Sequence, residues 1–208
     1  MFSFHPEEVR VLGCLIEKRF STPDNYPLSL NSLVSACNQS SNRDPVESYE
    51  AAEVDSALKS LRAQSYALIF SGADSRVAKF KENLCEKLTL SRPLASVLAE
   101  LMLRGPQTGG ELRSRTTRMF EFPDLSAVEA VLQELAEREL IVQLARQPGK
   151  REARWAHQLC GPVDPGEAPA PAEPRSSISS ALEDRVSALE DRLSEVLEKL
   201  DKLLPLLD

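Results

Sequence analysis

RVAKFKENLC (76–85) aligns without a gap on REARWAHQLC (151–160). Four of the ten positions are identical, and the alignment pairs two aromatic residues, Phe80 and Trp155. Self-similarity of this kind within one chain is the signature of a repeated structural unit. The alignment therefore predicts that the chain contains two copies of one fold.

The similarity continues upstream of these two segments. VDSALKSLRAQSYAL (54–68) and VEAVLQELAERELIV (128–142) both place apolar residues at i, i+4 and i+7, which is the spacing of a helix with one buried face. Further upstream, VLGCLIEKR (11–19) matches VLAELMLRG (97–105). The repeated unit is thus roughly 80 residues long.

Each copy has the same expected order of elements. Three helices come first, and two strands then close the unit. The strands are expected at 67–71 with 77–81 and at 140–144 with 153–156, and a glycine-containing loop joins each pair. Three helices followed by a hairpin form the winged-helix arrangement. The predicted fold class is α+β, mainly α with small β-hairpins, in two tandem winged-helix domains.

Several helix starts are marked in the sequence. TGGE (108–111) and SAVE (126–129) both have the spacing of a capping box, and Pro6 is suited to the first turn of a helix. The two glycines of TGGE also suggest a phosphate-binding loop, but helix capping explains them better.

The character of the sequence changes after residue 160. GPVDPGEAPAPAEPRSS (161–177) holds five prolines, which exclude a continuous helix and predict an extended, disordered linker. The next segment contains a heptad repeat, because ALEDRVS (181–187) is followed directly by ALEDRLS (188–194). The expected organisation is a first winged-helix domain over 1–85, a second over 86–160, the linker, and a coiled-coil helix over 178–208.

The apolar residues of the tail alternate at spacings of four and three residues, which is the period of a coiled-coil seam. The tail is therefore expected to make the protein a homo-oligomer, and folding back onto the body of the chain is the alternative. The residues predicted to form the oligomer seam are Leu182, Val186, Leu189, Leu193, Val196, Leu200 and Leu203.

Three long stretches carry a resemblance to a known family. They are GCLIEKRFSTPDNYPLSLNSLVSACNQSSNRDPV (13–46), LRGPQTGGELRSRTTRMFEF (103–122) and RQPGKREARW (146–155). Together they resemble the YceH-like family, bacterial proteins without an established biochemical role. The resemblance implies a tandem winged-helix fold and a bacterial, cytoplasmic setting. It carries over no catalytic, cofactor or binding residues, because the family has none established.

The composition offers little conventional catalytic chemistry. The chain has two histidines, no phosphate-binding loop and no dinucleotide-binding fingerprint. Four widely spaced cysteines, Cys14, Cys37, Cys85 and Cys160, form no C-x-x-C pair, so free buried thiols are expected rather than a zinc site. We therefore expect no catalytic residue, metal or cofactor, and an enzyme is the least favoured class.

The net charge of −7 is unevenly distributed. Residues 1–85 carry −2, residues 86–160 carry +1, and residues 161–208 carry −6. The body of the chain is thus nearly neutral, and this balance neither requires nor forbids a nucleic-acid partner. Local clusters of basic residues must therefore decide whether nucleic acid is a partner.

A winged helix usually reads DNA by placing its third helix in the major groove, with the wing on the backbone. The third helix of the second copy is poorly suited to this role, because carboxylates repel phosphates. Its outward residues are Glu129, Gln133, Glu134, Glu137 and Glu139. The third helix of the first copy is more permissive, with Asp55, Ser56, Lys59, Ser60 and Arg62 outward.

Basic residues elsewhere offer phosphate contacts, although arginines in a small domain also pair with glutamates. The predicted nucleic-acid interface comprises Arg43, Lys59, Arg62, Arg113, Arg115, Arg118, Arg146, Lys150 and Arg151, with Arg154 also on the second wing.

Two classes of function stay open. The first is binding of double-stranded DNA in a transcription-regulator-like role. The alternative is a protein–protein interaction adaptor that uses the winged-helix domains and the acidic coiled-coil tail. No stretch approaches the ~18 apolar residues of a membrane helix, and the N-terminus lacks an export signal, so no membrane contact and a cytoplasmic location are expected.

Overall fold

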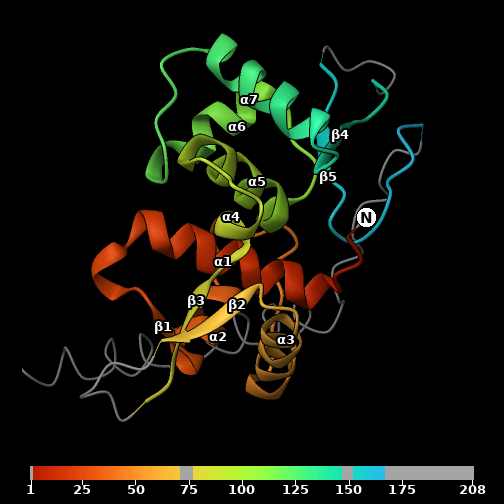
Figure 1. Cartoon of the computed structure of the whole chain (residues 1–208). Helices are drawn as coiled ribbons and strands as arrows, with labels where there is room; N and C mark the ends of the chain where they lie inside the picture. The colour runs from red at the N-terminus through yellow and green to blue at the C-terminus, as the bar shows by residue number, and fades with distance from the viewer. Residues whose placement is uncertain (1, 71–76, 147–151, 167–208) are drawn as a thin grey trace, which may run out of the picture. The chain divides into compact units, whose positions relative to one another are not determined.

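A computed structural model of the chain describes residues 2–70, 77–146 and 152–166, all of which belong to one compact unit, Met1–Pro169 (Figure 1). In these ranges the chain is α+β, with seven α-helices and small antiparallel sheets. The predicted coiled coil, with its seven seam residues, lies outside the described residues, as does most of the predicted linker.

The first half of the unit runs from helix α1 to strand β3. Its elements are α1 (Pro6–Ser21), the 3-10 helix η1 (Pro23–Asn25), β1 (Leu28–Ser29), α2 (Leu30–Cys37), α3 (Ala51–Ala63), β2 (Ala67–Phe70) and β3 (Lys79–Glu82). The three strands form one antiparallel sheet in the order β1-β3-β2.

The second half runs from helix α4 to strand β5. After the short helix α4 it again has three α-helices followed by two strands, but its described residues include no strand in the place of β1. Its elements are α4 (Leu84–Lys87), α5 (Arg92–Arg104), α6 (Gly109–Arg115), the 3-10 helix η2 (Thr116–Arg118), α7 (Leu125–Glu137), β4 (Ile141–Gln143) and β5 (Trp155–His157). Strands β4 and β5 pair antiparallel, and both returning strands, β3 and β5, begin two residues later than expected.

The two aligned sequence segments take corresponding places in the two sheets. Phe80 pairs with Leu28 between β3 and β1, and Trp155 pairs with Gln107 in an isolated antiparallel bridge. The bridge stands where the first half has strand β1, so the second half keeps the same pairing in a shorter form. Phe80 is buried, and Trp155 is partly buried against the core.

Helical periodicity correctly located the buried face of the third helix in each half. The side chains at i, i+4 and i+7 are all at most 1% exposed, and they are Val54, Leu58 and Leu61 of α3 and Val128, Leu132 and Leu135 of α7. Burial of this stripe against neighbouring helices stabilises each third helix more than its intrinsic propensity does.

The helix starts follow the sequence signals with one correction. The capping box at Thr108 and Glu111 is confirmed, with both hydrogen bonds present, and Pro6 begins α1. The capping box predicted for SAVE (126–129) is wrong, because α7 begins two residues earlier. Asp124 is its N-cap, and its Oδ1 accepts from the backbone N–H of Ala127 at 2.9 Å. Asp and Ser cap helices equally well, so sequence alone did not separate them.

Helices α1 and α5 pack directly against each other and join the two halves (Figure 1). A Cβ atom at Gly13 would lie 3.0 Å from both Cγ and Cδ2 of Leu103, so the glycine permits this close approach. The buried apolar residues of both halves form one continuous cluster. The two halves therefore share a core.

Two further expectations need adjustment. Cys14, Cys37, Cys85 and Cys160 are all free, but Cys160 is exposed rather than buried. The first residues of the predicted linker, 161–166, are described, and the carbonyl of Pro165 accepts from the backbone N–H of Ala145 at 2.6 Å.

Candidate functional site

The exposed side of helix α3 carries two of the predicted phosphate-binding residues. Lys59 and Arg62 are both exposed. The ammonium of Lys59 lies 2.7 Å from the carboxylate of Asp55, one turn earlier. Exposed ion pairs at this spacing contribute at most a few tenths of a kcal/mol, so Asp55 does little to hold Lys59 away from another anion.

A groove of about 530 Å³ lies between α3 and β2. Lys59, Arg62 and Ala63 line it from the helix, and Ala67, Leu68 and Ile69 line it from the strand. Its lining therefore contains two basic side chains and no acidic one. Ile69 and Phe70, at the end of β2, are 40% and 47% exposed. We call this site the basic groove.

Arg43 lies inside the protein and not on a surface, since it is only 4% exposed. Its Nη2 donates to the carboxylate of Glu17 at 2.7 Å and to the carbonyl of Ala36 at 2.8 Å. Its Nη1 donates to the carbonyl of Asn42 at 2.7 Å. These hydrogen bonds attach the loop after α2 to helix α1.

Some basic residues of the second half donate hydrogen bonds within the protein, and others are only exposed. Arg113, although exposed, donates to the carbonyl of Pro123 at 2.8 Å, and Arg115 donates to Oε1 of Gln107 at 2.7 Å. Arg118 and Arg146 are exposed. Lys150 and Arg151 lie outside the described residues.

Glu111 forms ion pairs with two arginines of the second half. The guanidinium of Arg154 lies 3.0 Å from its carboxylate, and that of Arg115 lies 3.4 Å away. Burial would raise the pKa of Glu111, but the N–H of Thr108 and the two guanidinium groups hold the pKa below its ordinary value. Arg154 also donates to the carbonyl of Pro106 at 2.6 Å. These contacts tie α6 to the residue just before β5.

Helix α7 presents the acidic face that the sequence indicates. Glu129, Gln133 and Glu137 are exposed along it, and Glu139 is exposed just beyond its end. Glu134 is half-buried and pairs with Arg138. This face offers carboxylates where a DNA-reading helix needs donors and positive charge.

Sequence reasoning missed a buried polar network between the two halves. The amide of Asn42 donates to Oε1 of Glu17 on α1 at 3.1 Å and to Oε1 of Glu100 on α5 at 3.0 Å. Asn42 has a φ of 56°, which asparagine tolerates better than most residues. Burial raises the pKa of Glu100 to about 7. The only sequence signal was a polar loop, NQSSNR (38–43), which does not say that its side chains point inward.

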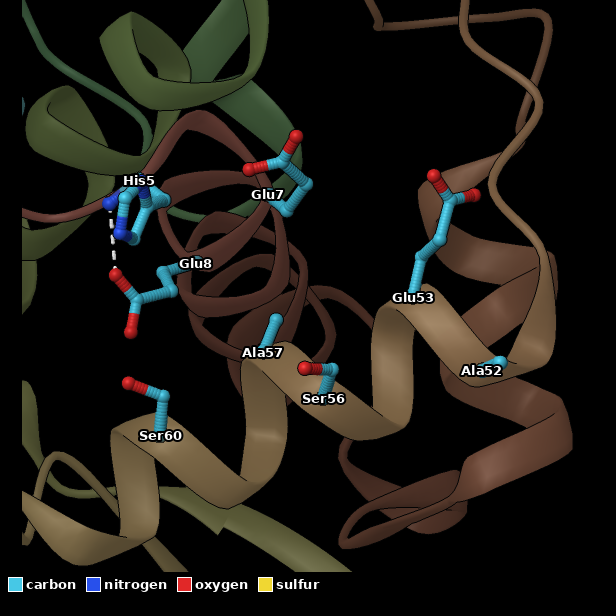
Figure 2. A pocket seen from close by; sticks show the side chains of 8 residues that line it. All are labelled: His5, Glu7, Glu8, Ala52, Glu53, Ser56, Ala57 and Ser60. Atoms are coloured by element: carbon cyan, nitrogen blue, oxygen red, sulfur yellow. Dashed lines mark hydrogen bonds between the residues drawn. The ribbon is translucent and has the colours of Figure 1, made fainter.

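A second hollow lies between α3 and the start of α1. It has a volume of about 480 Å³. Its polar lining residues are His5, Glu7, Glu8, Glu53, Ser56 and Ser60, and Ala52 and Ala57 complete it. We call this site the acidic pocket (Figure 2).

The described residues contain neither a metal-binding group of side chains nor a membrane-spanning helix. Within 2–70, 77–146 and 152–166, no three His, Cys, Asp or Glu side chains are grouped as a metal ion requires. In the same ranges no helix has both the length and the apolar character needed to cross a membrane.

Comparison with known proteins places the chain in a family. Residues 4–150 match the family described as "Protein of unknown function, DUF480". A UPF0502 protein of Solibacter usitatus is 49% identical over 185 residues, which cover 86% of this chain and 89% of the relative. A UPF0502 protein of Geobacter sulfurreducens is 56% identical over 160 residues, which cover 76% of this chain and 72% of the relative. The UPF0502 protein YceH of Escherichia fergusonii is 44% identical over 186 residues, covering 86% of each chain. The expected resemblance is therefore confirmed, and the chain belongs to the DUF480 family of YceH-like bacterial proteins.

Proposed function

We propose that this chain is a non-enzymatic, cytoplasmic, tandem winged-helix protein that binds duplex DNA, chiefly through its first half, in a transcription-regulator-like role. The order of three helices and a hairpin in each half is compatible with that fold. In this assignment α3 and α7 are the third helices, and the β2–β3 and β4–β5 hairpins are the wings.

The basic groove is the observation that carries the proposal. A winged helix contacts DNA with its third helix and its wing, and this groove lies between α3 and a strand of the wing. Lys59 and Arg62 line it, and phosphate contacts of this kind supply most of the sequence-independent affinity for DNA.

The second half is assigned a smaller part in DNA binding. Its third helix presents carboxylates, and Arg113 and Arg115 are engaged in hydrogen bonds within the protein. Arg118 and Arg146 are its exposed candidates for phosphate contact. Arg43 has no part, because its guanidinium is buried.

A salt titration of binding to a random-sequence duplex tests the proposal. Fluorescence anisotropy is measured with the full chain between about 50 and 200 mM salt. Replacing both Lys59 and Arg62 by alanine is expected to lower the slope of log K against log salt by about two. The double variant R118A/R146A removes the same charge from the second half and is expected to change the slope less. Absence of binding at low salt, or equal slopes in both variants, would refute the assignment to the first half.

The acidic face of α7 favours a second candidate function, a protein-interaction adaptor. Exposed glutamates along one helix suit a basic partner surface better than they suit DNA. Under this alternative the charge-reversing variant E129K/E137K abolishes capture of the partner, whereas K59A/R62A does not.

We also propose that residues 178–208 make the protein a homo-oligomer through a coiled coil. Sedimentation of the full chain is compared with that of a version ending at Pro169. This end point keeps the hydrogen bond between Ala145 and Pro165. The full chain is expected to sediment as a dimer or larger and the shortened chain as a monomer; two monomers would exclude the oligomer.

A further inference from the structure

The acidic pocket has an unbalanced charge. Glu7 and Glu8 line it from the first turn of α1, and Glu53 lines it from the first turn of α3. No lysine or arginine is among its lining residues. A hollow with several carboxylates and no compensating cation attracts positively charged solutes.

Glu8 is the residue that points to a ligand. It is only 3% exposed, and its Oε2 accepts from the backbone N–H of His5 at 2.7 Å, which caps α1. Its Oε1 is buried and makes no hydrogen bond with any described residue. A buried carboxylate oxygen without a donor is costly, so this atom marks a place for one. Figure 2 shows the Glu8 carboxylate between His5 and Ser60.

The form of the pocket favours an organic cation over a metal ion. Glu7 and Glu53 project away from Glu8 in Figure 2, so the three carboxylates do not converge on one point. A metal such as Ca²⁺ needs six or more oxygens at about 2.4 Å. The volume of about 480 Å³ lies within the range of small-molecule sites.

The two ends of the pocket suit an alkyl chain with ammonium groups. An ammonium carries three donors, and Oε1 of Glu8 and the hydroxyl of Ser60 are acceptors on facing elements. Ala52 and Ala57 supply apolar contact along α3. Glu53 lies farther along the same helix, where a second ammonium finds an opposite charge.

We propose that the acidic pocket binds a small aliphatic amine, with one ammonium on Glu8 and Ser60 and the alkyl chain along α3. A diamine binds more tightly than a monoamine of the same length, because it also meets Glu53. This site uses residues of α3 that do not line the basic groove, and the proposal does not depend on DNA binding.

Isothermal titration of the full chain with 1,4-diaminobutane tests the proposal. Saturable binding of one molecule per chain is expected, and butylamine binds more weakly. The substitution Glu8→Gln removes the charge but keeps an acceptor for the N–H of His5, since glutamine also serves in capping boxes. It is expected to weaken binding about tenfold or more, because it removes a charge-assisted hydrogen bond. Glu129→Gln, a matched change on α7, leaves binding unchanged.

Several outcomes would overturn the proposal. They are absence of saturable binding, equal affinity of wild type and Glu8→Gln, and tighter binding of Mg²⁺ than of the diamine with the same dependence on Glu8. If Glu8→Gln fails to fold, as judged by circular dichroism, Ser60→Ala and Glu53→Gln take its place. Each is expected to weaken diamine binding, and unchanged affinity in both would equally refute the site.

Discussion

The buried carboxyl of Glu100 is expected to make folding stability depend on pH. Glu100 is 1% exposed, and its Oε2 has no hydrogen-bond partner among the described residues. Burial raises its pKa to about 7, and the charge of Glu17 adds to the rise. The hydrogen bond from Asn42 and the charges of Arg104 and Arg115 act in the opposite direction. Replacing Glu100 by glutamine isolates this effect.

The size of the effect follows from the two pKa values. The ordinary value for the carboxyl is about 4.5 and the folded value is about 7, and each pH unit between them corresponds to about 1.4 kcal/mol. The folded state holds the proton of Glu100 more tightly than the unfolded state does, so protonation stabilises the folded protein. This stabilisation is fully present below about pH 4.5 and is lost as the pH rises through 7. Ionised Glu100 thus costs the folded protein about 3 kcal/mol above pH 7.

Urea denaturation of wild type and Glu100→Gln at several pH values between 5 and 8 provides the assay. Glutamine is neutral throughout, so the two proteins should agree within about 1 kcal/mol at pH 5. At pH 8 the variant should be more stable by about 3 kcal/mol. Glu129→Gln on the exposed face of α7 serves as the control and should show no such divergence. A difference between wild type and Glu100→Gln that stays constant with pH would refute the reasoning.

Four other substitutions test the packing and the helix capping described above. Gly13→Ala should lower the free energy of unfolding by about 1–2 kcal/mol, because the cost of overpacking against α5 exceeds the gain in helix propensity. An unchanged denaturant midpoint would show that α5 shifts to accommodate the methyl group without cost. Arg43→Ala should cost about 3–5 kcal/mol, because the buried carboxylate of Glu17 loses its closest ionic partner and the carbonyl of Ala36 loses its donor. A loss below 1 kcal/mol in urea denaturation would contradict that assignment. Asp124→Ala should cost about 1 kcal/mol as a lost N-cap, and Ser126→Ala clearly less; the reverse order in thermal unfolding would restore the predicted capping box.

Local sequence patterns predicted the α+β class and the buried faces of individual helices well, because they record which side chains are buried along one element. The apolar spacing of Val54, Leu58 and Leu61 follows the helical period. The buried face of this helix can therefore be predicted without knowing which elements pack against it. The alignment of Phe80 with Trp155 likewise located paired strands in both halves, since Phe80 lies opposite Ile69 in the first hairpin and Trp155 lies opposite Gln143 in the second.

Contacts between distant elements were decided only by the tertiary structure. Arg43 and Arg62 are chemically identical in the sequence, yet one is buried against Glu17 and the other is exposed beside the basic groove. Asn42 joins carboxylates 25 and 58 residues away, and no periodicity along the chain relates such positions. A charged side chain is placed by the elements that surround it after folding. Its residue type determines only which partners it can bind. The sequence therefore identified the basic residues, but only the packing determined which of them are buried and which are exposed.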